Sequence, residues 1–170
     1  KETSSGGGAV VWLEPEKCTL APHIKSAADK VIGGKYDLVM FRRADLDSYP
    51  PEQIHTYQMV QLAFKYLTSV DCDFLFGPVV LSHKATDYFL AYKSEYGDLW
   101  DSIHVPKFRI IRDCLPWTQV TIDYQHPKEQ TMAEQGNMGL FMRRVEQIRL
   151  VTQALVDEVA QYKQNETTDS

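Results

Sequence analysis

Cysteine is scarce in this sequence, and long hydrophobic runs are missing from it. Cys18, Cys72 and Cys114 are widely spaced and form no Cys-x-x-Cys pair, which argues against a disulfide framework or a cysteine zinc site. No apolar run reaches the ~20 residues of a membrane-spanning helix, and no basic segment leads into an apolar one as in a secretory leader. We therefore expect a cytoplasmic chain without a transmembrane segment.

Positive charge is also in short supply, since 18 lysine and arginine residues stand against 23 aspartate and glutamate residues. The formal net charge of −5 argues against a broad nucleic-acid surface, which needs clustered cations to displace counterions. The sequence also lacks Gly-x-Ser-x-Gly, His-x-x-x-His and a glycine-rich phosphate loop. These motifs mark several hydrolases and nucleotide-binding enzymes, so an unrelated small hydrolase is the weakest of the functions considered.

The chain is nonetheless rich enough in apolar residues to fold. It has 170 residues, of which 44% are hydrophobic, and a chain of this length buries about two-thirds of its unfolded surface. We predict a flexible segment over residues 1–8, a single α/β domain over 9–163 and a disordered tail over 164–170. Because an apolar strand begins so close to the first residue, we expect this domain to be part of a larger one.

Hydrophobic periodicity predicts an alternation of strands and helices. The predicted fold class is therefore α/β, with a mixed, mostly parallel sheet that is flanked by helices. An apolar strand is predicted to begin at Val10 and to end in Glu14-Pro15-Glu16. Further strands are predicted over Tyr36–Phe41 and Thr118–His126, and at most over the flanks of Phe74–Leu81, whose middle is a turn or a close backbone approach. The predicted helices are Pro22–Ile32, Gln53–Leu67, His83–Tyr92 with Ser82 as its N-cap, and those over about 102–113 and 137–162.

Acidic and imidazole side chains follow two of these strands. Glu14 and Glu16 end the first strand and His126 ends the last, and the carboxyl ends of strands are where α/β proteins bind ligands. Carboxylate oxygens with one imidazole suit Mn²⁺ or Mg²⁺, so these three residues are the predicted metal ligands. The alternative is that the glutamates are solvated residues that open a helix, and that His126 is an exposed residue at a strand end.

Two further clusters have the chemistry of a substrate site. Asp98, Trp100 and Asp101 combine carboxylates with an aromatic face, which suits a sugar ring that stacks and donates hydrogen bonds. The alternative is a tryptophan anchored in the core beside an aspartate that caps a helix. Arg42 and Arg43 could hold phosphate oxygens, or could simply be solvated at the end of their strand.

The order of these segments along the chain resembles the later portion of nucleotide-sugar-dependent glycosyltransferases of the GT-A fold. The similarity is to the family-two type, which includes polyprenyl-phosphate sugar transferases and glucosylglycerate-type synthases, and it covers roughly residues 10–150. Segments similar to family elements are Trp12-Leu13-Glu14-Pro15-Glu16, Tyr36–Arg43, Phe76–Lys84 with Gly77, Gly97–Asp101 and Val120–His126.

The resemblance implies transfer of a sugar from a nucleotide diphosphate sugar to a hydroxyl or phosphate acceptor, which is small or lipid-linked. It implies that Glu14, Glu16 and His126 hold a divalent metal, that Asp101 or Asp98 is the catalytic carboxylate, and that Trp100, Arg42, Arg43 and Gly77 contact substrate. Two departures count against it: the acidic motif has glutamate where the family has aspartate, and the nucleotide-binding first half would precede Val10. A complementary N-terminal chain or a homo-oligomer would then complete the site, and the alternative is a non-catalytic module that binds sugar or protein.

Overall fold

The computed structural model describes residues 7–96 and 100–168, which group into two compact units. The first unit comprises residues 1–44, 76–92 and 106–124, and the second comprises 45–75, 93–105 and 125–170. Each unit is built from three separate stretches of chain, so the domain predicted over residues 9–163 is described below unit by unit.

The first unit contains a four-stranded sheet of order β1-β3-β2-β4. Its strands are β1 (Val10–Trp12), β2 (Leu38–Arg43), β3 (Val79–Leu81) and β4 (Trp117–Ile122). β3 pairs antiparallel with both β1 and β2, while β2 and β4 are parallel. The predicted α/β class with a mixed sheet is therefore confirmed, but two of the three strand pairs are antiparallel.

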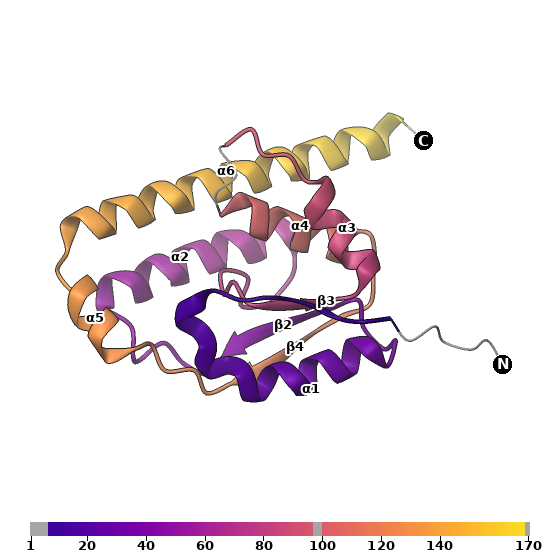
Figure 1. Ribbon diagram of the computed structural model, residues 1–170. Helices are drawn as coiled ribbons and strands as arrows, with labels where there is room; N and C mark the ends of the chain where they lie inside the picture. Colours follow the sequence, from indigo (N-terminus) through magenta and orange to yellow (C-terminus); the bar gives the residue numbers. More distant parts are fainter. Residues whose placement is uncertain (1–6, 97–99, 169–170) are drawn as a thin grey trace. The chain divides into compact units, whose positions relative to one another are not determined.

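Burial explains why these strands form. Leu38, Val39 and Phe41 in β2 are fully buried, and so are Val79 and Val80 in β3. A continuous β-branched and aromatic run of this kind is typical of a strand that is covered on both faces. The helix α1 (Ala21–Ile32) contacts β2 and β3 (Figure 1), and Ala27 and Val31 on that helix are buried.

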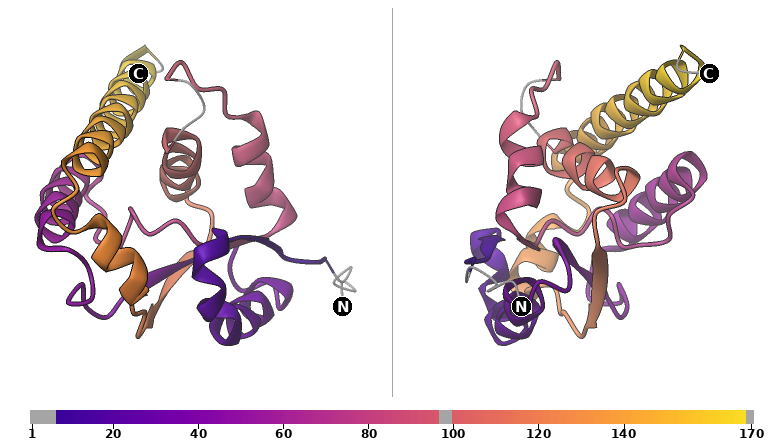
Figure 2. Two further views of the ribbon diagram at one scale, coloured as in Figure 1. Left: turned by 60° about the vertical axis from the view of Figure 1, so that its left-hand side comes forward. Right: turned by 90° about the vertical axis from the view of Figure 1, so that its right-hand side faces the viewer.

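The second unit is helical. Its main elements are α2 (Pro51–Thr68) and α6 (Met138–Thr168), which contact each other and run in the same general direction, with the short α5 (Lys128–Glu134) leading into α6 (Figure 1, Figure 2). Gly136, with φ +70°, allows the turn between α5 and α6, because a left-handed backbone there favours glycine. Asn137 caps α6, since its Oδ1 accepts the Leu140 N–H at 3.2 Å.

Two helices complete the list of elements. α3 (His83–Ala91) lies in the first unit and contacts β3, whereas α4 (Asp101–Arg112) contributes residues 101–105 to the second unit and 106–112 to the first. None of the helices in the described part of the chain has both the length and the apolar character needed to cross a membrane.

Several predicted boundaries were wrong. β1 ends at Trp12, and the segment Pro15–Leu20 is a 3-10 helix, η1, which begins where Pro15 removes a backbone donor and the Lys17 N–H closes a turn on the Glu14 carbonyl at 2.9 Å. β4 ends at Ile122, so His126 lies beyond the ladder rather than at the end of the strand. The helix α5 was not predicted, and α6 extends to Thr168, into the range predicted as a tail.

Ser82 provides a test of how α3 is joined to the sheet. Its hydroxyl accepts the Ala85 N–H at 3.1 Å as an N-cap and donates to Asp37 Oδ1 at 2.5 Å, as the sequence predicted for the cap. We expect Ser82→Ala to lower the free energy of unfolding by about 1–3 kcal/mol, because both the cap and a hydrogen bond to a carboxylate are lost. Chemical denaturation measures this change. Ser26→Ala, on the exposed face of α1, is the control, and an equal loss in both variants would contradict the assignment.

Candidate functional site

The direction of the strands brings four chain segments to one edge of the sheet in the first unit. β1, β2 and β4 run the same way and β3 runs against them, so the ends of β1, β2 and β4 share an edge with the start of β3. Trp12 pairs with Val79, and Val79 also pairs with Met40. If the register is continued beyond the ladder, Gly77 comes opposite Glu14. This is the edge at which α/β proteins bind ligands.

Gly77 and Glu14 are in fact in close contact. A Cβ atom at position 77 would lie 2.3 Å from Glu14 Oε1 and 2.8 Å from Cζ3 of Trp12. Real Cβ atoms do not approach other atoms so closely, so only glycine fits between these two side chains without displacing them. The predicted site residue Gly77 therefore lies at the sheet edge, where its missing side chain makes room for the Glu14 carboxylate.

Glu14 is held in place by Lys17, one turn along η1. Lys17 Nζ lies 2.5 Å from Glu14 Oε1, and the two side chains are 14% and 24% exposed. The other carboxylate oxygen, Oε2, is buried and accepts no hydrogen bond from the described residues. A buried carboxylate oxygen normally has a donor, because its desolvation is otherwise uncompensated. Glu14 can therefore accept a hydrogen bond from a ligand at this edge.

The ring of Phe76 is the centre of this cluster. Lys17 Nζ lies 5.2 Å from the ring centroid and Arg43 Cζ lies 4.9 Å from it, distances at which a cation is attracted to an aromatic ring. The ring of Tyr124 is also nearby, with 5.3 Å between centroids. Lys107, which is fully buried, donates from Nζ to the Phe76 carbonyl at 2.9 Å. We call Glu14, Lys17, Arg43, Phe76 and Gly77 the sheet-edge cluster.

The neighbouring predicted residues lie outside this cluster. Arg42 precedes Arg43 in β2, and successive side chains of a strand point to opposite faces, so Arg42 is exposed whereas Arg43 is 7% exposed. Glu16 lies in the first turn of η1 and is exposed. Its charge is favourable at the start of a helix, as in the alternative that the sequence left open.

The predicted catalytic carboxylate Asp101 belongs to the second unit. It is the first residue of α4, is 1% exposed and accepts a hydrogen bond from the Ser94 hydroxyl. Trp100 precedes it, and the Trp100 ring meets His104 edge-on, with 6.2 Å between ring centroids. An aspartate in the first turn of a helix is electrostatically favourable, so Asp101 has a structural role whether or not it is catalytic. Asp98 lies outside the described residues.

His126, the third predicted metal ligand, is buried among residues of the second unit. Its Nδ1 lies 2.8 Å from Thr131 Oγ1, and that hydroxyl also donates to the Ser48 carbonyl at 2.8 Å. The Thr131 hydroxyl has one proton, which it donates to the Ser48 carbonyl. His126 Nδ1 is therefore the donor in its contact with Thr131 Oγ1. His126 Nε2 lies 3.9 Å from a carboxylate oxygen of Glu134. The alternative that His126 is an exposed residue at a strand end is therefore wrong, because the residue is 6% exposed. Its role as a metal ligand stays a prediction.

The predicted metal ligands do not form a ready ligand set in the described residues. No group of three histidine, cysteine, aspartate or glutamate side chains close enough to hold a metal occurs in residues 7–96 and 100–168. One oxygen of Glu14 is already neutralised by Lys17, and His126 belongs to the other unit. The divalent cation stays a prediction.

Sequence reasoning missed Lys17, Phe76, Lys107 and Tyr124. Lys17 could have been found, since a Glu-x-x-Lys spacing places the two charges one helical turn apart. Phe76 directly precedes Gly77-Pro78, and proline cannot donate to a ladder, so the break before β3 could have suggested that Phe76 leaves the sheet there. Lys107 carried no signal, because a lysine in an amphipathic helix is normally exposed.

The contact between Gly77 and Glu14 predicts the effect of a small substitution. We expect Gly77→Ala to lower the free energy of unfolding by roughly 1–3 kcal/mol, because the new methyl group must displace Glu14 and Trp12. Thermal or urea unfolding measures it. Gly8→Ala is the control, since its Cβ would find its nearest neighbour at 4.0 Å. The double variant Gly77→Ala/Glu14→Ala should recover part of the lost stability. Equal stability of Gly77→Ala and Gly8→Ala would contradict the packing.

Glu134 predicts a dependence of stability on pH. Burial alone would raise the pKa of Glu134, but hydrogen bonds from Gln130 and Gln53 and the charge of Arg144 lower it below its ordinary value of 4.5. A lowered folded-state pKa stabilises the fold above the unfolded value, and this contribution is lost as the pH falls through the folded pKa. We expect Glu134→Gln to be less stable than the wild type at neutral pH, with the difference shrinking in acid. Urea unfolding from about pH 7 to pH 3 tests this. Glu129→Gln, an exposed neighbour in α5, should show no such trend.

Comparisons with known proteins provide no independent assignment. The chain matches no protein-family model. Comparison with curated proteins and with solved structures also found no match. The case for any function therefore depends on the residues themselves, and on the sheet-edge cluster above all.

Proposed function

We propose that the chain is a glycosyltransferase-like domain that transfers a sugar from a nucleotide diphosphate sugar to a hydroxyl or phosphate acceptor. The observation that carries the proposal is the sheet-edge cluster. A carboxylate oxygen without a donor and two cations lie together where three strands end, the position at which sheets of this class bind ligands. A nucleotide diphosphate sugar offers hydroxyl groups that can donate to the carboxylate oxygen and phosphate oxygens that can pair with the two cations.

In this proposal the residues of the first unit bind the donor. Glu14 Oε2 accepts a hydrogen bond from a donor hydroxyl, and Lys17 and Arg43 neutralise charge on the diphosphate as it leaves. The Phe76 ring holds both cations near the edge, and the buried ammonium of Lys107 keeps the Phe76 backbone in place. The roles that the resemblance implies for Asp101 and Trp100, contact with the acceptor and with a sugar ring, stay a separate prediction about the second unit. A divalent cation at Glu14 and Glu16 remains part of the proposal, whereas His126 lies in the other unit and is not included among its ligands.

One observation favours a second candidate, a non-catalytic module that binds sugar or protein. Lys17 occupies Glu14 Oε1 at 2.5 Å, and an ammonium at that position competes with a metal for the same carboxylate. A carboxylate neutralised by a lysine is a good acceptor for hydroxyl groups but a weaker ligand for Mn²⁺. Such a module would bind a sugar without nucleotide and without metal.

Calorimetric titration distinguishes the two candidates. The purified chain is titrated with a panel of nucleotide diphosphate sugars and with the corresponding free sugars, each with and without Mn²⁺. We expect one sugar nucleotide to bind, and Glu14→Gln to weaken it by roughly tenfold or more, the usual effect of losing a hydrogen bond to a charged group. Asp29→Asn, an exposed carboxylate on α1, should leave the affinity unchanged.

Each result of the titration supports or excludes one of the candidate functions. Binding of a free sugar that is equal with and without nucleotide and metal would favour the non-catalytic module. Binding that requires Mn²⁺ and is lost in Glu16→Gln would support the metal part of the proposal. No binding of any sugar nucleotide to the folded chain, or equal binding in wild type and Glu14→Gln, would rule out the sheet-edge cluster as the donor site.

A further inference from the structure

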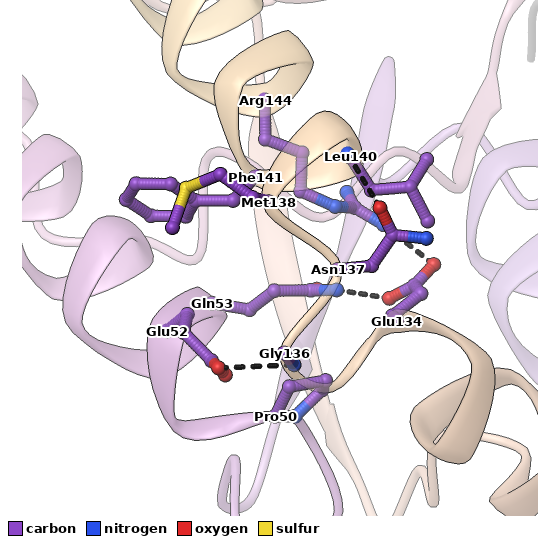
Figure 3. Close-up of a pocket in the computed structure, with 10 residues that line it drawn as sticks. All are labelled: Pro50, Glu52, Gln53, Glu134, Gly136, Asn137, Met138, Leu140, Phe141 and Arg144. Carbon is purple, nitrogen blue, oxygen red and sulfur yellow. Dashed lines mark hydrogen bonds and ion pairs between the residues drawn. The ribbon is translucent and has the colours of Figure 1, made fainter.

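The second unit contains a cavity that the proposed function does not use. It measures about 120 Å³ and is lined by the first turn of α2, the end of α5 and the first turns of α6 (Figure 3). Met138 and Phe141 form an apolar side, whereas Glu52, Gln53 and Arg144 contribute polar groups. Met138 is 68% exposed, so the cavity opens to solvent beside its thioether.

The polar groups of the cavity are not all satisfied. Gln53 is 5% exposed and donates its amide N–H to Glu134, yet its buried Oε1 accepts no hydrogen bond from the described residues. The orientation of the amide is set by this contact, since the reverse orientation would turn its oxygen toward a carboxylate. Glu52 Oε1 accepts the Gly136 N–H at 3.1 Å, but its buried Oε2 likewise has no donor among those residues. The cavity therefore presents two buried acceptors that require hydrogen-bond donors.

The charge of the lining narrows the choice of ligand. Glu134 is matched by Arg144, whose Nη2 lies 2.9 Å from Glu134 Oε1, and it also accepts hydrogen bonds from Gln130 and Gln53. Glu52 has no cation within ion-pair distance among the described residues. Neutral hydroxyl groups could satisfy the two acceptors but would leave the Glu52 charge uncompensated.

We propose that this cavity binds a small primary ammonium group that carries a short apolar chain. An ammonium has three N–H donors and no acceptor, which matches Gln53 Oε1 and Glu52 Oε2 and balances the Glu52 charge. The apolar chain lies against Phe141 and Met138. A cavity of about 150 Å³ holds a benzene molecule, so 120 Å³ suits a ligand of about five non-hydrogen atoms.

The probe for this site is n-butylammonium chloride, and 1-butanol is a comparison of the same length without charge. Titration of the folded chain is followed by NMR at the Gly136 amide and the Met138 methyl group, with sodium chloride matched. We expect saturable shifts with butylammonium and binding of 1-butanol that is weaker by roughly tenfold or more. Saturation by neither compound, or equal affinity for both, would overturn the proposal.

Two pairs of variants locate the site. Glu52→Gln removes the charge at the cavity and should weaken butylammonium by roughly tenfold or more, whereas Glu129→Gln removes an exposed charge on α5 and should not. Because Glu52 also binds the Gly136 N–H, a second pair leaves Glu52 intact. Met138→Lys places a tethered ammonium at the rim and should abolish binding, while Met132→Lys, 77% exposed and outside the cavity, adds the same charge without that effect. Unchanged affinity in Glu52→Gln and Met138→Lys would show that butylammonium binds elsewhere.

Discussion

The direction of one short strand determines where the candidate donor site lies. β3 runs against β1 and β2, and its pairing begins at Val79 because Pro78 has no N–H to donate. The two residues before that proline therefore lie beyond the ladder, at the edge where the other three strands end. Phe76 then meets Arg43 and Gly77 meets Glu14. If β3 were parallel to its neighbours, Phe76 and Gly77 would lie at the opposite edge, and Glu14 would have no such partner.

In the second unit, three helices meet at the half-buried carboxylate of Glu134. The low exposure of Glu134 is tolerated because α2, α5 and α6 each supply it with a donor, from Gln53, Gln130 and Arg144. Breaking one of these contacts would leave part of a buried charge uncompensated, which costs more than the contact itself contributes. The need of Glu134 for donors also explains the unsatisfied Gln53 oxygen. When the Gln53 amide turns its N–H toward Glu134, its oxygen must face the cavity.

Much of the local structure could be predicted from the sequence, but the contacts of the site could not. Helical spacing and the Ser82 cap correctly indicated α1 and α3, and the apolar run of β2 was recognised because burial on both faces leaves a clear pattern. The placement of Glu14 and Arg43 at one edge followed from strand direction. The contacts through Phe76 and Lys107 did not, since they depend on strand order and on a buried lysine, neither of which leaves a local signal. The 3-10 helix was missed because short polar segments with a proline are also typical of loops.

The ion pair of Glu14 and Lys17 bears on how a transferase with this site would manage charge. In the resembling family the acidic motif brings a metal to the leaving diphosphate, so the carboxylates act on the diphosphate through a cation. Here the cation nearest to Glu14 is the ammonium of Lys17, which the Phe76 ring also attracts. The glutamate side chain at position 14 reaches this lysine three residues further along the chain, whereas an aspartate is shorter by one methylene. Under the proposed function, glutamate at the positions where the resembling family has aspartate is consistent with a site in which Lys17 and Arg43 provide the positive charge themselves.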